Sequence, residues 1–350
     1  MRICSTNKWM VVLSATLITT ACDQNPAGHH ETVPEFRHDV STSAKPWTND
    51  DFDNDGNKFT FALFSDLTGG EREQIFEVAV AQLSLLRPEL IMNIGDLIEG
   101  GTTDREQLKR EWDSFDARAG RAKAPIFRVG GNHDLTNIVM RDFWEQRFGV
   151  RYYYFVYKNA LFLILDTEDH TKERMQEISN ARDNAMELAM AEGWDAFGQT
   201  EYMAMPEQVA GAISSVQSAY IRQAIADNPD VRWTFLFMHK APWLNDEEED
   251  FAAIEQALAD RPYTVFHGHE HTYNHQKRLG RDYVRLATTG GVQFSDKGLS
   301  IDHVTMVTVS EAGVDIANLR LSGIFDKTGH IPLGGDGLCF DTSKCAENAN

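Results

Sequence analysis

Apolar positions along residues 59–310 follow two periods in turn, one typical of strands and one typical of helices. Short apolar runs predict strands, whereas apolar residues at three- and four-residue steps predict helices. The predicted strands span residues 59–65, 90–94, 125–129, 152–157, 161–166, 232–238, 264–267, 272–276, 283–288 and 303–309. The predicted helices span residues 71–86, 104–119, 139–148, 213–227 and 248–259. This alternation, followed by a strand-rich half, predicts an α/β fold of two packed sheets with helices outside.

Other segments depart from this pattern and suggest the domain boundaries. Residues 171–204 are charged and contain Met, which predicts a helical insertion between two strands. We expect the folded domain to cover residues 59–325 and residues 326–350 to form a C-terminal tail. Residues 22–58 are rich in Asp, Asn, Pro, Thr and Ser and have no apolar period, which is typical of a tether.

The first 21 residues have the layout of a secretory signal peptide. Arg2 and Lys8 form a basic start, and the apolar run at residues 9–18 is too short to span a membrane stably. Small residues before Cys22 resemble the bacterial lipoprotein box, in which the Cys is lipidated and anchors the protein to a membrane. By resemblance to enterobacterial lipoproteins, Asp23 suggests retention at the inner membrane. We therefore expect an exported, periplasmic protein anchored through Cys22, with plain secretion as the alternative.

The chain is acidic, with a formal net charge of −20 from 33 Lys and Arg and 53 Asp and Glu residues. This excess argues against nucleic-acid backbones and anionic lipid surfaces as partners. The alternative is that the charge only keeps an exported protein soluble. A small phosphorylated substrate would need local positive charge, which bound metal ions can supply.

Four Cys residues are present, and none has a metal-site spacing such as Cys-x-x-Cys. Cys4 lies in the signal segment and Cys22 is the candidate anchor. Cys339 and Cys345 lie close together near the C-terminus, and an oxidising compartment permits a disulfide between them. The sequence leaves their pairing and the oligomeric state open.

Five predicted strands end in side chains that commonly bind metal ions. The residues after these ends are Asp66, Asp96, Asn132-His133-Asp134, His239 and His269-Glu270-His271. Each one alone could be a turn or a helix cap, but His269 and His271 alternate and would point to one side of an extended segment. Open α/β sheets place ligands beyond the carboxyl ends of their strands, so neighbouring strands would bring these side chains together. Their joint occurrence predicts one metal-dependent site.

In order and spacing this series resembles the calcineurin-like metallophosphoesterase superfamily, over residues 59–310. The resemblance implies a four-layer αββα sandwich of two mixed sheets flanked by helices. It also implies two divalent transition-metal ions, Mn, Fe or Zn, with Asp96 as the carboxylate that bridges them. The remaining ligands would be Asn132, His239 and His269 on one metal, and Asp66 and His271 on the other.

The same resemblance implies hydrolysis of a phosphomonoester or phosphodiester by in-line attack of a hydroxide that bridges the two metals. His133 would bind no metal and would protonate the leaving oxygen. Glu99 resembles the acidic partner that orients this His in some members, although it can also be a solvated loop acid. The insertion at residues 171–204 would shape the choice of substrate.

The first motif departs from the family pattern at Thr68, where members usually have a His on the Asp66 metal. Neutral Thr is a poor ligand, so that metal would bind more weakly, take an additional water or recruit another residue. Candidate replacements are Asp166, Glu168, Asp169 and His170, each of which can also be a surface-loop residue. Gly69 and Gly70 would let backbone N–H groups approach an anion. Thr68 also keeps open a non-catalytic alternative, a metal-binding envelope lipoprotein on a decayed enzyme fold.

Overall fold

A five-stranded mixed sheet contains the first strands of the predicted domain. The computed structural model of the protein describes residues 36–50 and 58–345. The strand order in this sheet is β12-β11-β2-β3-β4, in which β2, β3 and β4 are parallel and β11 is antiparallel to both of its neighbours. The strands are β2 (Phe59–Phe64), β3 (Leu90–Asn93), β4 (Ile126–Phe127), β11 (His303–Ser310) and β12 (Gly313–Arg320).

A seven-stranded mixed sheet packs against the first one, with the strand order β1-β5-β6-β7-β8-β10-β9. Its central strands β6, β7, β8 and β10 are parallel, and antiparallel strands lie at both edges. The strands are β1 (Phe36–His38), β5 (Tyr153–Tyr157), β6 (Ala160–Ile164), β7 (Trp233–Phe237), β8 (Tyr263–His267), β9 (Asn274–Arg278) and β10 (Arg281–Arg285).

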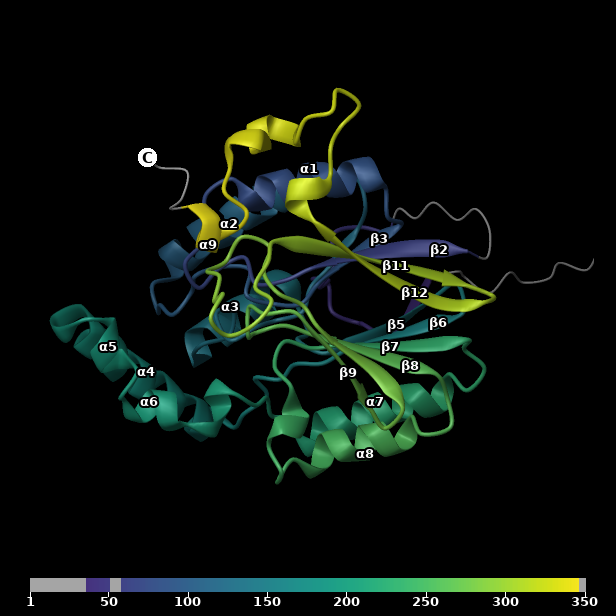
Figure 1. The fold of residues 1–350 in the computed structure, drawn as a ribbon. Coiled ribbons are helices and arrows are strands. Elements are labelled where there is room, and N and C mark those ends of the chain that lie inside the picture. The colour runs from purple at the N-terminus through teal and green to yellow at the C-terminus, as the bar shows by residue number, and fades with distance from the viewer. Residues whose placement is uncertain (1–35, 51–57, 346–350) are drawn as a thin grey trace, which may run out of the picture. The chain divides into compact units, whose positions relative to one another are not determined.

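Helices cover the outer faces of both sheets (Figure 1). Helices α1 (Ile75–Leu86), α2 (Arg105–Ala119) and α3 (Ile138–Phe148) pack on the five-stranded sheet. Helices α7 (Ser215–Asp227) and α8 (Glu249–Ala257) pack on the seven-stranded sheet. A buried aromatic core that includes Phe61, Phe162 and Phe235 separates the two sheets. The fold is therefore the expected four-layer αββα sandwich.

Strand β2 shows why the apolar runs form buried strands. Its side chains alternate between the two faces of the sheet, as the pleat of a strand requires. Phe61 and Leu63 point into the core between the sheets, whereas Ala62 and Phe64 pack under the helices of the outer layer. Because both faces are covered, the strand reads as a continuous apolar run rather than as an alternating one.

The segment after β6 forms helices, as the insertion was expected to do. It contains α4 (Lys172–Glu192), α5 (Trp194–Phe197), α6 (Glu201–Ala204) and the 3-10 helix η1 (Pro206–Gln208). Thr171 begins α4 because its hydroxyl accepts a hydrogen bond from the backbone N–H of Arg174. In Figure 1, these helices extend to the left of the two sheets.

The segment predicted as a C-terminal tail packs on the domain as far as it is described. It contains the short helices η4 (Pro332–Gly337) and α9 (Thr342–Cys345), while η3 (Leu321–Gly323) precedes it and η2 (Pro242–Leu244) follows β7. Gly335 of η4 lies close to Val78 of α1, and Gln293 donates a hydrogen bond to the carbonyl of Phe340. Cys339 and Cys345 form a disulfide, which answers the question that the sequence left open.

Residues 36–50 belong to the folded domain, which corrects the assignment of this stretch to the tether. Strand β1 pairs with β5, and the buried Trp47 packs against Phe127 with ring centroids 5.6 Å apart. The predicted signal peptide and Cys22 lie outside the described residues. Within residues 36–50 and 58–345, no helix is both long enough and apolar enough to span a bilayer.

Candidate metal centre

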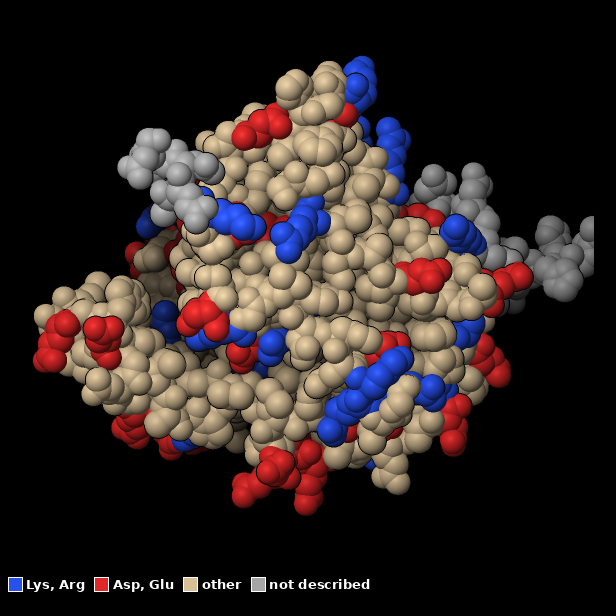
Figure 2. Space-filling view, in the orientation of Figure 1, with Lys and Arg blue, Asp and Glu red and all other residues tan. Residues whose placement is uncertain are grey.

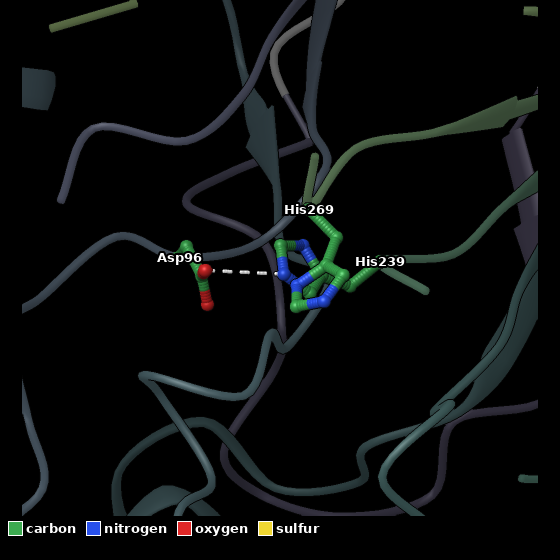
Figure 3. A group of neighbouring side chains, drawn as sticks. All are labelled: Asp96, His239 and His269. Atoms are coloured by element: carbon green, nitrogen blue, oxygen red, sulfur yellow. Dashed lines mark ion pairs between the residues drawn. The ribbon is translucent and has the colours of Figure 1, made fainter. Parts of the chain in front are cut away.

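The ends of β2, β3, β7 and β8 bring the predicted ligands together at one edge of the sandwich. Ligand atoms of Asp96, His239 and His269 lie within 4.8 Å of one another, and those of Asp66, Asp96 and His271 form a second such group. Figure 3 shows Asp96 facing the rings of His239 and His269 across the first group. Asp96 belongs to both groups, so its carboxylate lies between two potential metal positions. The sixth predicted ligand, Asn132, places Oδ1 3.1 Å from His239 Nε2.

Four of these ligands have a left-handed backbone, which is uncommon for residues other than Gly. The φ angles are 53° at Asp66, 56° at Asp96, 77° at His269 and 52° at His271. Such conformations carry a cost and persist only where the surroundings hold them, and they cluster at functional sites. The fold accepts local strain here because the chain must turn sharply after each strand to aim its side chain at the same point.

Each of the three histidines donates one ring N–H to a main-chain carbonyl. His239 Nδ1 lies 2.7 Å from the Ile94 oxygen, His271 Nδ1 lies 2.6 Å from the Val292 oxygen, and His269 Nε2 lies 2.8 Å from the Gln208 oxygen. A carbonyl oxygen can only accept, so each contact fixes the tautomer of a neutral ring and leaves the other nitrogen with a lone pair. Neutral imidazole nitrogens held in this way are suited to bind Mn, Fe or Zn.

The free ring nitrogens face oxygen atoms, and this arrangement fits a bound cation. His239 Nε2 lies 3.1 Å from Asp96 Oδ2, and His271 Nε2 lies 3.4 Å from Asp66 Oδ1. Opposed lone pairs repel unless a proton or a metal ion lies between them. Burial by itself lowers the pKa of His239, but the Asp96 carboxylate outweighs burial and raises that pKa to about 9. Metal binding would replace this proton, since a ligating imidazole must be neutral.

Burial and charge act differently on the two carboxylates. Burial raises the pKa of Asp66 above its ordinary value. Burial opposes ionisation of Asp96 as well, yet His239 and His133 hold its pKa below the usual range. The pKa of His269 is well below its ordinary value because of burial and the nearby Lys240, so this ring is neutral. The site therefore offers one strongly ionised carboxylate at its centre, with the neutral ring of His269 beside it.

Asp134 organises the loop that carries Asp96, a role that its residue type and position in the sequence do not predict. This fully buried carboxylate accepts hydrogen bonds from the backbone N–H groups of Asp96, Leu97, Ile98 and Gly131, at 2.8–3.3 Å. These contacts satisfy donors that the sharp turn after β3 leaves without strand partners. The only sequence signal was its place beside His133 in the Asn-His-Asp motif.

His133 lines the same cavity, and its contact with Glu99 differs from the expected one. His133 Nδ1 donates to the main-chain carbonyl of Glu99 at 2.8 Å, which leaves Nε2 towards Gly69. The Glu99 carboxylate instead accepts from the backbone N–H groups of Gly69, Gly70 and Glu71, at 3.0–3.3 Å. The prediction that the Glu99 side chain orients His133 is thus corrected, because its backbone makes that contact. The anion expected near Gly69 and Gly70 is this carboxylate.

Thr68 stands where the family has a His, and its side chain has a structural use. Its buried hydroxyl lies 3.0 Å from the Ile98 carbonyl and 3.3 Å from the Asp96 carbonyl. The hydroxyl has one hydrogen, which it shares between these two acceptors. It thereby connects the loop after β2 to the loop after β3. No imidazole therefore reaches the Asp66 position from this residue.

Of the four candidate replacements for that imidazole, the three carboxylates have partners elsewhere. Asp166 pairs with Arg151 at 2.7 Å, and Glu168 pairs with Lys240 at 2.9 Å. Asp169 accepts from Gln217 at 3.0 Å. His170 lies 4.0 Å from the Glu168 carboxylate. None of the four belongs to the two ligand groups found among the described residues.

Replacing Gly95 with alanine should destabilise the protein and weaken metal binding. Gly95 has a φ of +93°, and an added Cβ would lie 2.7 Å from His239 Nδ1 and 2.9 Å from the Gly131 backbone. Strain and overpacking together should cost about 2–5 kcal/mol of unfolding free energy. Urea denaturation and elemental analysis of bound metal would measure both effects.

Gly280→Ala is the matched control for this substitution. Gly280 also has a positive φ, +74°, but nothing lies within 4 Å of its added Cβ. Left-handed strain alone should cost about 1–2 kcal/mol there, with metal content unchanged. Equal losses in the two variants would show that the crowding around Gly95 has no effect.

A cavity of about 480 Å³ opens beside the metal ligands. Its lining includes residues of the helical insertion as well as Asp96, Asn132, His133, His269 and His271. Figure 2 shows acidic side chains spread over the surface of that insertion, at the left of the view. Arg182 of the insertion also lines the cavity, and bound metal ions would add the positive charge that an anionic substrate needs there.

An αββα sandwich with Asp, Asn and His side chains gathered at its strand ends defines a metal-dependent hydrolase of phosphate esters. The sequence model of the calcineurin-like phosphoesterase family matches residues 59–273, and the chain belongs to this family. The resemblance stated from the motifs is thereby confirmed, as are the fold class and the assignment of the chain as a phosphoesterase.

Several solved structures are similar to this chain at low sequence identity. GAP50, the anchor in the inner membrane complex of Plasmodium, is 13% identical, with 79% of this chain and 87% of that chain covered and a TM-score of 0.46. A purple acid phosphatase from yellow lupin seeds is 12% identical, with 77% of this chain covered and a TM-score of 0.49. This chain spans 53% of the lupin protein. A putative 5'-nucleotidase from Staphylococcus aureus is 14% identical, with 79% of this chain and 56% of that chain covered and a TM-score of 0.42. No curated protein sequence matches.

Proposed function

We propose that the protein hydrolyses a phosphomonoester or phosphodiester at a centre of two divalent metal ions. The observation that supports two ions rather than one is the position of Asp96, whose carboxylate belongs to both ligand groups. A carboxylate has two oxygens and can serve two cations at once. Its Oδ2 faces His239 at 3.1 Å, and its Oδ1 accepts the backbone N–H of His133 at 2.8 Å.

The residues divide into one group that holds the metals and one that acts on the substrate. Asp96, Asn132, His239 and His269 would hold one ion, and Asp96, Asp66 and His271 the other. Two such ions polarise the phosphate, activate water and stabilise the attacking and leaving oxygens of an in-line displacement. His133 has its Nδ1 occupied by the Glu99 carbonyl, so Nε2 is the atom that would give a proton to the leaving oxygen.

The Asp66 position would be the weaker of the two. Asp66 and His271 are its own ligands beside the shared Asp96, since the Thr68 hydroxyl is committed to main-chain carbonyls. The other position has Asn132, His239 and His269 beside Asp96. Fewer protein ligands leave more coordination positions open to water and substrate. The metals are therefore expected to load in sequence, with the Asp66 position filled last.

Hydrolysis of aryl phosphates with added metal is the experiment that tests this function. The full chain would be freed of metal with a chelator and supplied with Mn, Zn or Fe, then assayed with para-nitrophenyl phosphate and bis(para-nitrophenyl) phosphate. We expect turnover that disappears with the chelator and returns with metal, together with two metal ions per chain by elemental analysis. A protein that binds metal but turns over neither ester, nor any other mono- or diester in a screen, would support the non-catalytic alternative.

A further inference from the structure

The part of the cavity lining that lies outside the metal ligands, here called the wall, is rich in aromatic and apolar side chains. The insertion contributes Arg182, Met186, Trp194, Phe197 and Tyr202. Val292 and Phe294 line the cavity as well, and the Phe294 ring lies 5.5 Å from that of His271. The cavity thus joins a charged centre to an apolar surface.

The aromatic side chains of this wall contribute little to the core. Helices α5 and α6, which carry Trp194, Phe197 and Tyr202, have no buried residue, and Trp194 is 69% exposed. The rings nevertheless gather, with centroids 5.4 Å apart for Trp194 and Phe197 and 6.0 Å apart for Phe197 and Tyr202. Aromatic residues that gather beside a catalytic site, outside the buried core, are candidates for contact with a ligand.

The wall is fixed in place relative to the metal ligands by the residues that follow α6. The Gln208 carbonyl accepts the Nε2–H of His269 at 2.8 Å. The next residue back, Glu207, pairs with Arg174 of α4 at 2.8 Å and accepts from Lys240 through its carbonyl at 2.7 Å. Lys240 directly follows the ligand His239 in the chain. The insertion is therefore tied to His269 and to the residue that follows His239, and its aromatic rings stay beside the site.

We propose that the alcohol portion of the substrate carries an aromatic ring, which packs against the rings of Trp194 and Phe197 while the phosphate lies at the metal centre. This inference rests on the proposed function and names its substrate class. Aromatic rings stack on one another at centroid distances of 4.5–7 Å and gain free energy beyond the burial of their area. Tyr202 extends the same surface. A small alkyl phosphate would reach the metals without touching this wall.

Binding of two phosphonates that differ only in their organic group tests the inference without turnover. Calorimetric titration of the metal-loaded full chain with phenylphosphonate and methylphosphonate gives the ratio of their Kd values. We expect phenylphosphonate to bind about tenfold more tightly to the wild type. In the double variant Trp194→Ala and Phe197→Ala this preference should fall to about twofold or less, with the Kd of methylphosphonate unchanged. The same ratio in both proteins would overturn the inference.

Met190→Ala is the matched control, because Met190 lies on α4 of the same insertion and is 84% exposed but does not line the cavity. This variant should keep the wild-type preference for phenylphosphonate, and a similar loss there would contradict the role of the two rings.

Failure of the proposed function can be distinguished from failure of this inference. A wild type that prefers phenylphosphonate but hydrolyses no ester contradicts the function and supports the aromatic site. A wild type that hydrolyses esters but does not prefer phenylphosphonate supports the proposed function and contradicts the aromatic site.

Discussion

Replacing His133 with alanine should lower kcat by about 10²–10⁴ and leave the bound metal in place. His133 belongs to neither ligand group, and its Nε2 faces the cavity while Nδ1 is held by the Glu99 carbonyl. Alanine retains the backbone N–H that Asp96 accepts at 2.8 Å, so the central carboxylate should keep its position. The kcat of the metal-loaded enzyme and the metal content by elemental analysis are the two measurements.

The dependence on the leaving group separates a proton donor from a structural residue. A good leaving group such as para-nitrophenolate needs little protonation, whereas an alkoxide needs a full proton. The loss in His133→Ala should therefore be larger for an alkyl phosphate than for para-nitrophenyl phosphate. His275→Ala is the control, since this His pairs with Asp282 on the exposed surface and does not line the cavity. A loss that is equal for all leaving groups would contradict proton donation by His133.

Replacing Asp96 with asparagine should remove bound metal and abolish turnover. Asp96 is the carboxylate common to both ligand groups, so one substitution acts on both positions. Loss of residues that only support metal ligands costs about 10–100-fold in metal affinity, and loss of the shared ligand itself should cost at least about 100-fold. Equilibrium dialysis followed by elemental analysis would measure the affinity, and ester hydrolysis the activity.

Asparagine is the informative substitution because it preserves the shape of the side chain. Its amide oxygen can still accept the His133 N–H, and the buried contacts of Asp134 with the loop are untouched. Unfolding in the presence of a chelator, compared with metal-free wild type, would verify that the variant folds. An Asp96→Asn protein that keeps both metals at wild-type affinity would rule out the shared carboxylate.

Much of the fold could be predicted because the strands at its centre are buried on both faces. Runs such as Phe59–Phe64 and Trp233–Phe237 are apolar throughout, and a local pattern reveals them. The strands at the edges of the two sheets were harder to predict. Strand β12 is largely exposed and mixes polar with apolar residues, so it has no such pattern. Strand β1 has three residues and pairs with β5, more than a hundred positions away, which no local period can indicate.

The ligand types were also visible in the sequence, because each follows directly on a strand. Parallel strands end at the same edge of a sheet, so side chains just beyond them converge even when far apart along the chain. The structure does bring Asp66, Asp96, His239, His269 and His271 together. Their individual roles on two metals remain predictions. The predicted contact between Glu99 and His133 named the wrong atom of Glu99. Nothing in a sequence distinguishes a backbone carbonyl from a side-chain carboxylate as a partner.

The sequence by itself determined the kinds of atom available to the site and the strands that carry them. Only the tertiary structure decided what holds those atoms in place. The carbonyls of Ile94, Val292 and Gln208 fix the three imidazoles, and every residue has such a carbonyl, so no residue type marks the ones that are used. The aromatic wall likewise depends on where the insertion folds back, and that is set by packing between distant segments rather than by local pattern.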